Sequence, residues 1–93
     1  MNRAAETILI VEDDAGIAAL QQRMLARAGF AVDWRARPDE ARARIEQGGI
    51  DLLLLDNRLD SGVDGLELYR QLKEAGLDLP VILVTAFSDD ATE

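Results

Sequence analysis

The chain has 93 residues, 48% of them hydrophobic and 30% charged, which allows one globular domain with a single compact core. Its 18 acidic and 10 basic residues give a formal net charge of -8, which argues against binding to nucleic acid or anionic lipid. Cysteine and histidine are both absent, which excludes disulfides and thiolate sites and argues against zinc binding and triad catalysis.

The first predicted element is a strand at residues 8–11, a continuous apolar run typical of a parallel strand covered on both faces. Four apolar residues before three acids are too few for a signal peptide or a membrane span, so we expect a cytoplasmic protein without a membrane partner. A helix is predicted next, at residues 15–28, with Asp14 as its N-cap and Gly29 at its end. The apolar stripe of this helix, which we expect to face the core, consists of Ile17, Leu20, Met24 and Leu25.

Residues 31–36 alternate apolar and polar side chains, which predicts a half-exposed strand at the border of the sheet. A short helix is predicted to begin at Pro38, a residue favoured at the first helical position. It should end at the glycine pair Gly48 and Gly49, since glycine commonly follows the last helical turn.

Two further continuous apolar runs, residues 52–55 and 81–84, predict two more buried parallel strands. Between them a helix is predicted at about residues 65–75, closed by Gly76. The resulting order is βαβαβαβ, which predicts an α/β fold with helices on both faces of a parallel sheet. We expect the flavodoxin-like doubly wound arrangement with strand order 2-1-3-4, an order taken from known folds of this kind.

Acidic residues follow two of the predicted strands directly. Glu12, Asp13 and Asp14 come after the first strand, and Asp56 comes after the third. If the first and third strands are neighbours, as in the doubly wound order, their carboxyl ends meet at one crevice. These like charges then crowd together and favour a hard cation such as Mg²⁺. Asp14 also has a purely structural interpretation as a helix cap, and any of the others could be a solvated loop residue.

Four motifs occur in order along the chain, with the sequences ILIVEDD (residues 8–14), LLLLD (52–56), DGLEL (64–68) and PVILVTA (80–86). Together they resemble the receiver domain of bacterial response regulators, and the resemblance spans nearly the whole chain. Each motif alone is a weak signal, whereas four in the same order are a strong one. We therefore expect a signalling domain of a two-component system.

The resemblance implies that Asp56 accepts a phosphoryl group from the phosphohistidine of a sensor histidine kinase or a phosphotransfer protein. It implies Mg²⁺ as the cofactor. The protein ligands of this ion would be Glu12, Asp13, Asp56 and the backbone carbonyl of Arg58. Thr85 would hydrogen-bond the phosphoryl group, whose hydrolysis would later reset the switch.

The chain departs from the family pattern in two places. Residues 57–63 lack a proline and carry one extra residue, as in receivers attached to hybrid histidine kinases. The sequence ends at Glu93, before the fifth strand with its lysine, so residues 1–93 are expected to form an incomplete receiver domain. The only lysine, Lys73, is predicted on the third helix, away from the site. The fourth strand should then be an exposed apolar edge, which predicts self-association; an output domain beyond Glu93 is also compatible with this pattern.

Two alternative functions are left open by the residues. An aspartate-nucleophile phosphatase would use a similar acidic pocket with Mg²⁺, but it would need two aspartates separated by one residue after the first strand, a spacing that is absent here. A receiver-like module could also bind a partner protein without being phosphorylated, because a fold does not by itself fix a function.

Overall fold

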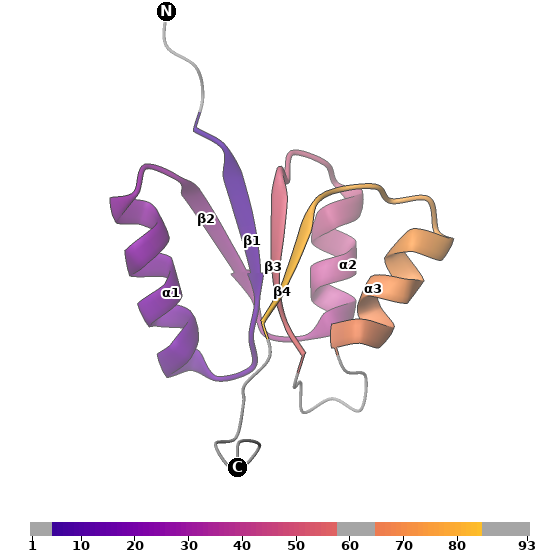
Figure 1. Ribbon diagram of the computed structural model, residues 1–93, viewed down its shortest axis with the longest axis horizontal. Coiled ribbons are helices and arrows are strands. Elements are labelled where there is room, and N and C mark those ends of the chain that lie inside the picture. The colour runs from indigo at the N-terminus through magenta and orange to yellow at the C-terminus, as the bar shows by residue number, and fades with distance from the viewer. Residues whose placement is uncertain (1–4, 58–64, 85–93) are drawn as a thin grey trace, which may run out of the picture.

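The computed structural model describes residues 5–57 and 65–84, which form a parallel sheet with helices on both faces (Figure 1). The strands are β1 (Thr7–Val11), β2 (Ala31–Arg35), β3 (Leu52–Asp56) and β4 (Val81–Val84). The helices are α1 (Ala15–Arg27), α2 (Pro38–Glu46) and α3 (Gly65–Glu74). The strand order is β2-β1-β3-β4 and every pairing is parallel, which confirms the predicted doubly wound α/β class and its order.

Helix α1 begins where the sequence predicts. The Asp14 carboxylate accepts hydrogen bonds from the backbone N–H groups of Gly16 at 2.9 Å and Ile17 at 3.0 Å, and so satisfies two of the free donors of the first turn. At the other end, Gly29 has φ +101°, a left-handed conformation that glycine adopts without strain. Both local signals therefore fix the limits of this helix.

The prediction that the apolar stripe of α1 faces the core is wrong for three of its four residues. Ile17, Leu20 and Met24 are 48%, 55% and 61% exposed. Helix α1 instead packs on β1 and β2 through Ala18, its one buried residue. In the described part of the chain no second helix lies beside α1 on this face of the sheet, so nothing covers the stripe (Figure 1).

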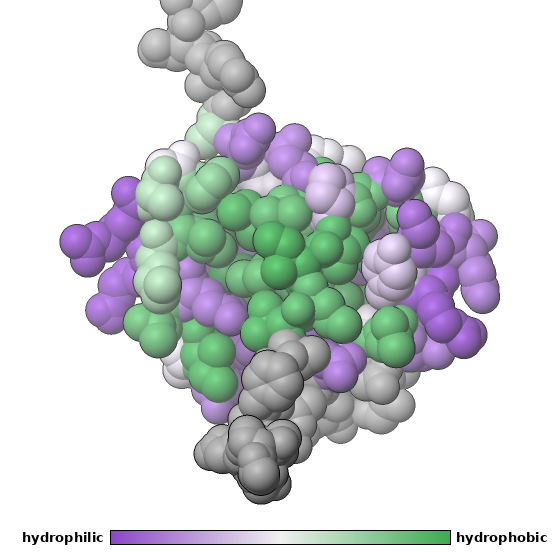
Figure 2. Space-filling model, viewed as in Figure 1, coloured by the Kyte–Doolittle hydropathy of each residue, from purple (hydrophilic) through white to green (hydrophobic). Residues whose placement is uncertain are grey.

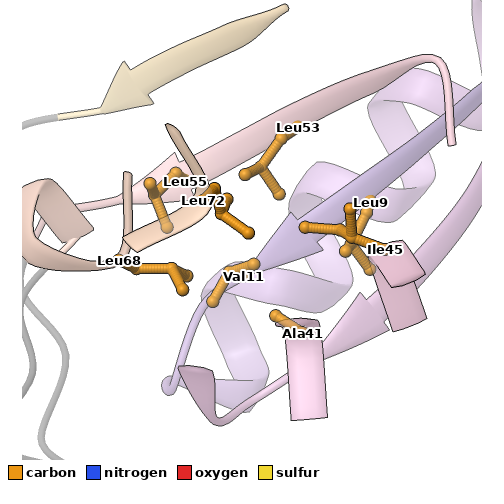
Figure 3. Close-up of a cluster of buried hydrophobic side chains, with 8 residues drawn as sticks. All are labelled: Leu9, Val11, Ala41, Ile45, Leu53, Leu55, Leu68 and Leu72. Atoms are coloured by element: carbon orange, nitrogen blue, oxygen red, sulfur yellow. The ribbon is translucent and has the colours of Figure 1, made fainter. Parts of the chain in front are cut away.

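The main core lies on the opposite face, where α2 and α3 pack side by side (Figure 1). Alternate residues of β1 and β3 point toward these helices and meet the buried residues of both (Figure 3). The cluster consists of Leu9, Val11, Ala41, Ile45, Leu53, Leu55, Leu68 and Leu72. It holds the two central strands rigidly, and the site described below is built on their ends.

Strand β2 lies at one border of the sheet and is half-buried along most of its length, as its alternation predicts. Its Asp33 carboxylate accepts a hydrogen bond from Arg44 Nε of α2 at 2.8 Å, on the face that carries the main core. Burial acts to raise the pKa of Asp33, but the hydrogen bonds from Arg44 and from the Trp34 N–H, together with the charges of Arg35 and Arg44, lower it below its usual value. This ion pair ties the edge strand to α2.

Strand β4 lies at the other border of the described sheet, and its side chains are only partly covered. Ile82 is 51% exposed and Leu83 is 38% exposed, on opposite faces of the strand. Figure 2 shows the resulting hydrophobic surface at the centre of the view, over the place of β4 in Figure 1. The predicted exposed apolar edge is thus observed, while self-association through it stays a prediction.

Helix α3 approaches the end of β3 very closely. The Gly65 N–H donates a hydrogen bond to the backbone carbonyl of Asn57 at 3.0 Å. A Cβ atom built on Gly65 would lie 2.5 Å from the backbone oxygen of Asp56, and 2.8 Å from the Cα atom of Asn57. Only glycine fits here, because the obstructing atoms belong to the backbone and cannot turn aside.

None of the helices in the described residues is long and apolar enough to cross a membrane.

The close approach at Gly65 predicts that Gly65→Ala lowers the free energy of unfolding by about 2–3 kcal/mol, since backbone must move to admit the methyl group. Chemical denaturation measures this change. Gly16→Ala is the matched control, because Gly16 also lies in the first turn of a helix and its new Cβ would meet only the Asp14 side chain, at 3.3 Å. Equal stabilities of the two variants would contradict the proposed steric cause.

Candidate functional site

The strand pairing places two acidic residues side by side at the carboxyl ends of the central strands, which lie at the bottom of Figure 1. Val11 pairs with Leu55, so the next step of the same register brings Glu12 beside Asp56. Asp56 is the last residue of β3, and Glu12 follows β1 directly. The buried side chains that precede them, Leu9 and Val11 on β1 and Leu53 and Leu55 on β3, pack in one cluster with α2 and α3 and so hold this register.

The structure brings Glu12, Asp13 and Asp56 together, as the sequence predicts. One carboxylate oxygen from each residue lies within 4.8 Å of the other two. Oxygens around one octahedral Mg²⁺ ion stand at most about 4.2 Å apart, since each lies about 2.1 Å from the metal. Small side-chain movements would therefore let all three bind one ion, and an all-oxygen, acidic donor set suits a hard cation.

Glu12 is the most buried of these acids, with only 4% of its surface exposed. Burial is the largest of the causes that together raise the pKa of Glu12 to about 7, and the charge of Asp56 and hydrogen bonds to Asp56 and Asp13 act in the same direction. A hydrogen bond from the Asp14 N–H at 3.1 Å has the opposite, lowering effect on this pKa. The Glu12 carboxyl therefore keeps its proton to a higher pH than an exposed glutamate does, and a cation bound there would displace that proton.

Two groups of strand β2 hold the backbone of Glu12. Its N–H donates to the backbone carbonyl of Arg35 at 3.3 Å, and its carbonyl oxygen accepts a hydrogen bond from Trp34 Nε1 at 2.7 Å. Sequence reasoning treated Trp34 only as an apolar residue of an edge strand. The available signal was its indole N–H, which needs a partner when the ring is half-buried.

The end of β3 is held by its neighbours on both sides. The Asn57 N–H donates to the Val84 carbonyl of β4 at 2.9 Å, and its Oδ1 accepts from the Leu66 N–H of α3 at 3.2 Å. Asn57 thus fixes the chain just after Asp56. Sequence reasoning missed this residue, because an asparagine after a strand looks like any loop residue.

Arg58 and Thr85, the other two predicted site residues, lie outside the described residues, so their roles stay predictions. Lys73 is in the last turn of α3, whereas it is the first turn that adjoins Asp56. Its Nζ atom lies 3.8 Å from the Asp78 carboxylate and 5.8 Å from the centre of the Tyr69 ring. The expectation that this lysine lies away from the site is confirmed.

A comparison with protein families gives one match, described as the response regulator receiver domain, over residues 8–93. The chain belongs to this family. It is a receiver domain of two-component signalling, as its four sequence motifs indicate. The narrower expectation, a receiver of the hybrid-kinase type, depends on residues 57–63, most of which lie outside the described part, and it stays a prediction.

Among its relatives, the transcriptional regulatory protein ResD of Bacillus subtilis is 38% identical over 92 residues, which are 98% of this chain and 38% of ResD. The swarming motility regulation protein RssB of Serratia marcescens is 39% identical over 79 residues, 85% of this chain and 36% of RssB. The solved structure of the response regulator TrrA from Thermotoga maritima is similar with a TM-score of 0.81 at 30% identity, covering 95% of this chain and 76% of TrrA. The chain thus spans little more than a third of the two sequence relatives.

The raised pKa of Glu12 predicts how stability depends on pH when a chelator keeps cations away. The folded chain keeps the Glu12 proton up to about pH 7, whereas the unfolded chain loses it near pH 4.5, so the free energy of unfolding should fall as the pH rises between these values. Glu12→Gln removes this fall. The variant should equal the parent near pH 4 and exceed it by a few kcal/mol at pH 8, as measured by urea unfolding.

Glu6→Gln is the control for this experiment, because it removes one acidic charge from an exposed position and should keep the pH dependence of the parent. If Glu12→Gln followed the same pH curve as the parent, burial would not be acting on the Glu12 carboxyl as described.

Proposed function

We propose that Asp56 accepts a phosphoryl group from a phosphohistidine, with Mg²⁺ bound by Glu12, Asp13 and Asp56. The observation that carries this proposal is the meeting of these three carboxylates within 4.8 Å at the carboxyl edge of the sheet. Three acids this close, one of them buried, are costly to keep charged unless a cation is present. Such a cost is typical of functional sites rather than of structural ion pairs.

The comparison with solved structures supports the same chemistry. TrrA is described as a complex with Mg²⁺ and beryllium fluoride. Beryllium fluoride bound to a carboxylate has the tetrahedral shape of a phosphoryl group, so a receiver with this fold can hold the metal and the phosphoryl mimic together. The acidic cluster of the present chain suits both.

In the proposed step, an oxygen of the Asp56 carboxylate forms a bond to phosphorus as the bond from phosphorus to the histidine nitrogen breaks. The leaving group is a neutral imidazole, which keeps the proton on its other ring nitrogen. When bound, Mg²⁺ supplies positive charge that neutralises the transferring oxygens. Asp56 is only half-buried, so the donor can reach it from the open edge of the sheet. Arg58, through its carbonyl, and Thr85 complete the proposed site on the strength of the family resemblance.

Water can reach an exposed acyl phosphate by the same path. Its attack on phosphorus would release inorganic phosphate and restore the Asp56 carboxylate. We therefore propose a signalling domain that transfers a phosphoryl group to itself and later loses it, rather than an enzyme that turns over a substrate. Residues 1–93 would be the receiver part of such a protein.

The proposed partners are a sensor histidine kinase or a phosphotransfer protein, and an output domain beyond Glu93. The net charge of -8 supports the absence of nucleic-acid binding through this segment. Oligomers and a cytoplasmic location stay predictions.

The proposal is tested by incubating the chain with radiolabelled acetyl phosphate and Mg²⁺. We expect label that is stable in the denatured protein and is removed by hydroxylamine, as for an acyl phosphate. Asp56→Asn should reduce incorporation to background, and omission of Mg²⁺ should do the same.

Asp51→Asn is the matched control, since Asp51 adjoins the opposite end of β3 and its side-chain oxygen, which accepts the Thr7 N–H at 2.8 Å, is kept in asparagine. Incorporation that survives Asp56→Asn would refute the acceptor role. No incorporation into the parent would favour the alternative of a binding module. Multiple turnovers of a small phosphate ester would favour a phosphatase.

A further inference from the structure

We propose that Trp34 is a positioning residue of the metal site, whose indole N–H fixes the peptide group that joins Glu12 to Asp13. The inference rests on the proposed function, because these two residues are the ligands assigned there. Trp34 lies on β2, whereas the proposed ligands follow β1 and end β3, and its side chain is uncharged and is not itself a proposed ligand.

The main support for this role is the hydrogen bond that Trp34 Nε1 donates to the backbone oxygen of Glu12, at 2.7 Å. It is short for a bond from nitrogen to oxygen. In the described residues it is the one hydrogen bond that this carbonyl accepts. The neighbouring backbone bond, from the Glu12 N–H to Arg35, is longer at 3.3 Å. The indole is therefore the tighter of the two contacts that hold Glu12 to β2.

The position of this carbonyl matters because it belongs to the peptide bond between Glu12 and Asp13. A peptide group is planar, so holding its oxygen fixes the plane and thereby the directions in which the two flanking Cα atoms lie. Both flanking residues contribute a carboxylate oxygen to the cluster. One hydrogen bond thus acts on two ligands just beyond the last residue of β1, beside the longer backbone bond from the Glu12 N–H to Arg35.

The indole itself is held by the strand that carries it. Trp34 pairs with Ile10 in the register of β2 against β1, and so points to the face on which α1 packs. The residues on either side point to the opposite face, where Asp33 binds Arg44 of α2 at 2.8 Å. Strand β2 is thus held from the opposite face of the sheet, and the half-buried indole projects from a backbone that is fixed on both sides.

A neutral donor suits this place better than a charged one. The indole N–H keeps its proton at every pH at which the chain folds and adds no charge to the cluster. An arginine or lysine at the same point would neutralise the carboxylates and compete with a cation for them. The choice of tryptophan therefore leaves the negative charge of the site available to the metal.

The test compares Mg²⁺ binding to the parent chain and to Trp34→Phe, by calorimetric titration with magnesium chloride. Phenylalanine keeps an aromatic ring on β2 but has no N–H. Loss of a partner that orients a metal ligand typically weakens metal binding about 10–100-fold, and we expect about tenfold here, because the bond is to the backbone of the ligands. Tyr69→Phe, which also removes one polar group from a half-buried aromatic residue, should bind Mg²⁺ as the parent does.

A second measurement separates the hydrogen bond from the packing of the ring. Trp34 is the only tryptophan of the chain, so biosynthetic incorporation of benzothienylalanine replaces it alone with a ring of the same shape that has sulfur in place of N–H. This substituted chain should show the same loss of affinity as Trp34→Phe. In the unmodified chain the single indole N–H resonance should exchange slowly with D₂O and should shift when Mg²⁺ is added.

The outcomes distinguish this inference from the function on which it rests. If the parent binds Mg²⁺ and both altered chains bind it equally well, Trp34 has no positioning role and the proposed function stands. If Trp34→Phe does not fold, the benzothienylalanine chain and the exchange rate of the indole N–H decide in its place. A parent chain that does not bind Mg²⁺ would overturn the metal site and the role of Trp34 together.

Discussion

The pairing of β1 with β3 is the constraint on which the rest of the structure depends. Its register is held by the packing of Leu9, Val11, Leu53 and Leu55 against α2 and α3 in one close-packed cluster. The same register leaves Glu12 and Asp56 as neighbours just beyond the last apolar pair. The stability of the core thus maintains a cluster of like charges that would not form by itself.

Burial and mutual repulsion make it unfavourable for all three carboxylates to be charged, so the cluster takes up a proton or a cation. A carboxyl as buried as Glu12 keeps its proton to about pH 7, so the metal-free site carries less charge than its three acids suggest. A divalent cation relieves the same repulsion without a proton and brings the oxygens closer together. The switch between these two states needs no large movement, because hydrogen bonds with β2, β4 and α3 already hold both strand ends.

The two faces of the sheet are not equally covered. On one face α2 and α3 close a hydrophobic core, whereas on the other α1 covers only β1 and β2. The apolar stripe of α1 and the outer strand β4 are therefore exposed in the described chain. The site lies at the sheet edge that both faces share, and it depends on the covered face for its rigidity and on β2 for the orientation of Glu12.

The sequence by itself determined the helices and strands, their order and the acids that end the strands. The signals for them are local: the spacing of apolar residues, the glycines that follow helices and the Asp14 cap. The strand neighbours were expected from the known order of doubly wound folds, and the structure confirms both that order and the meeting of Glu12, Asp13 and Asp56. Only the tertiary structure decided the burial of Glu12, the indole bond from Trp34, the close approach at Gly65 and the exposure of the α1 stripe. Each of these depends on which element covers which face and at what distance, and neither composition nor periodicity carries that information.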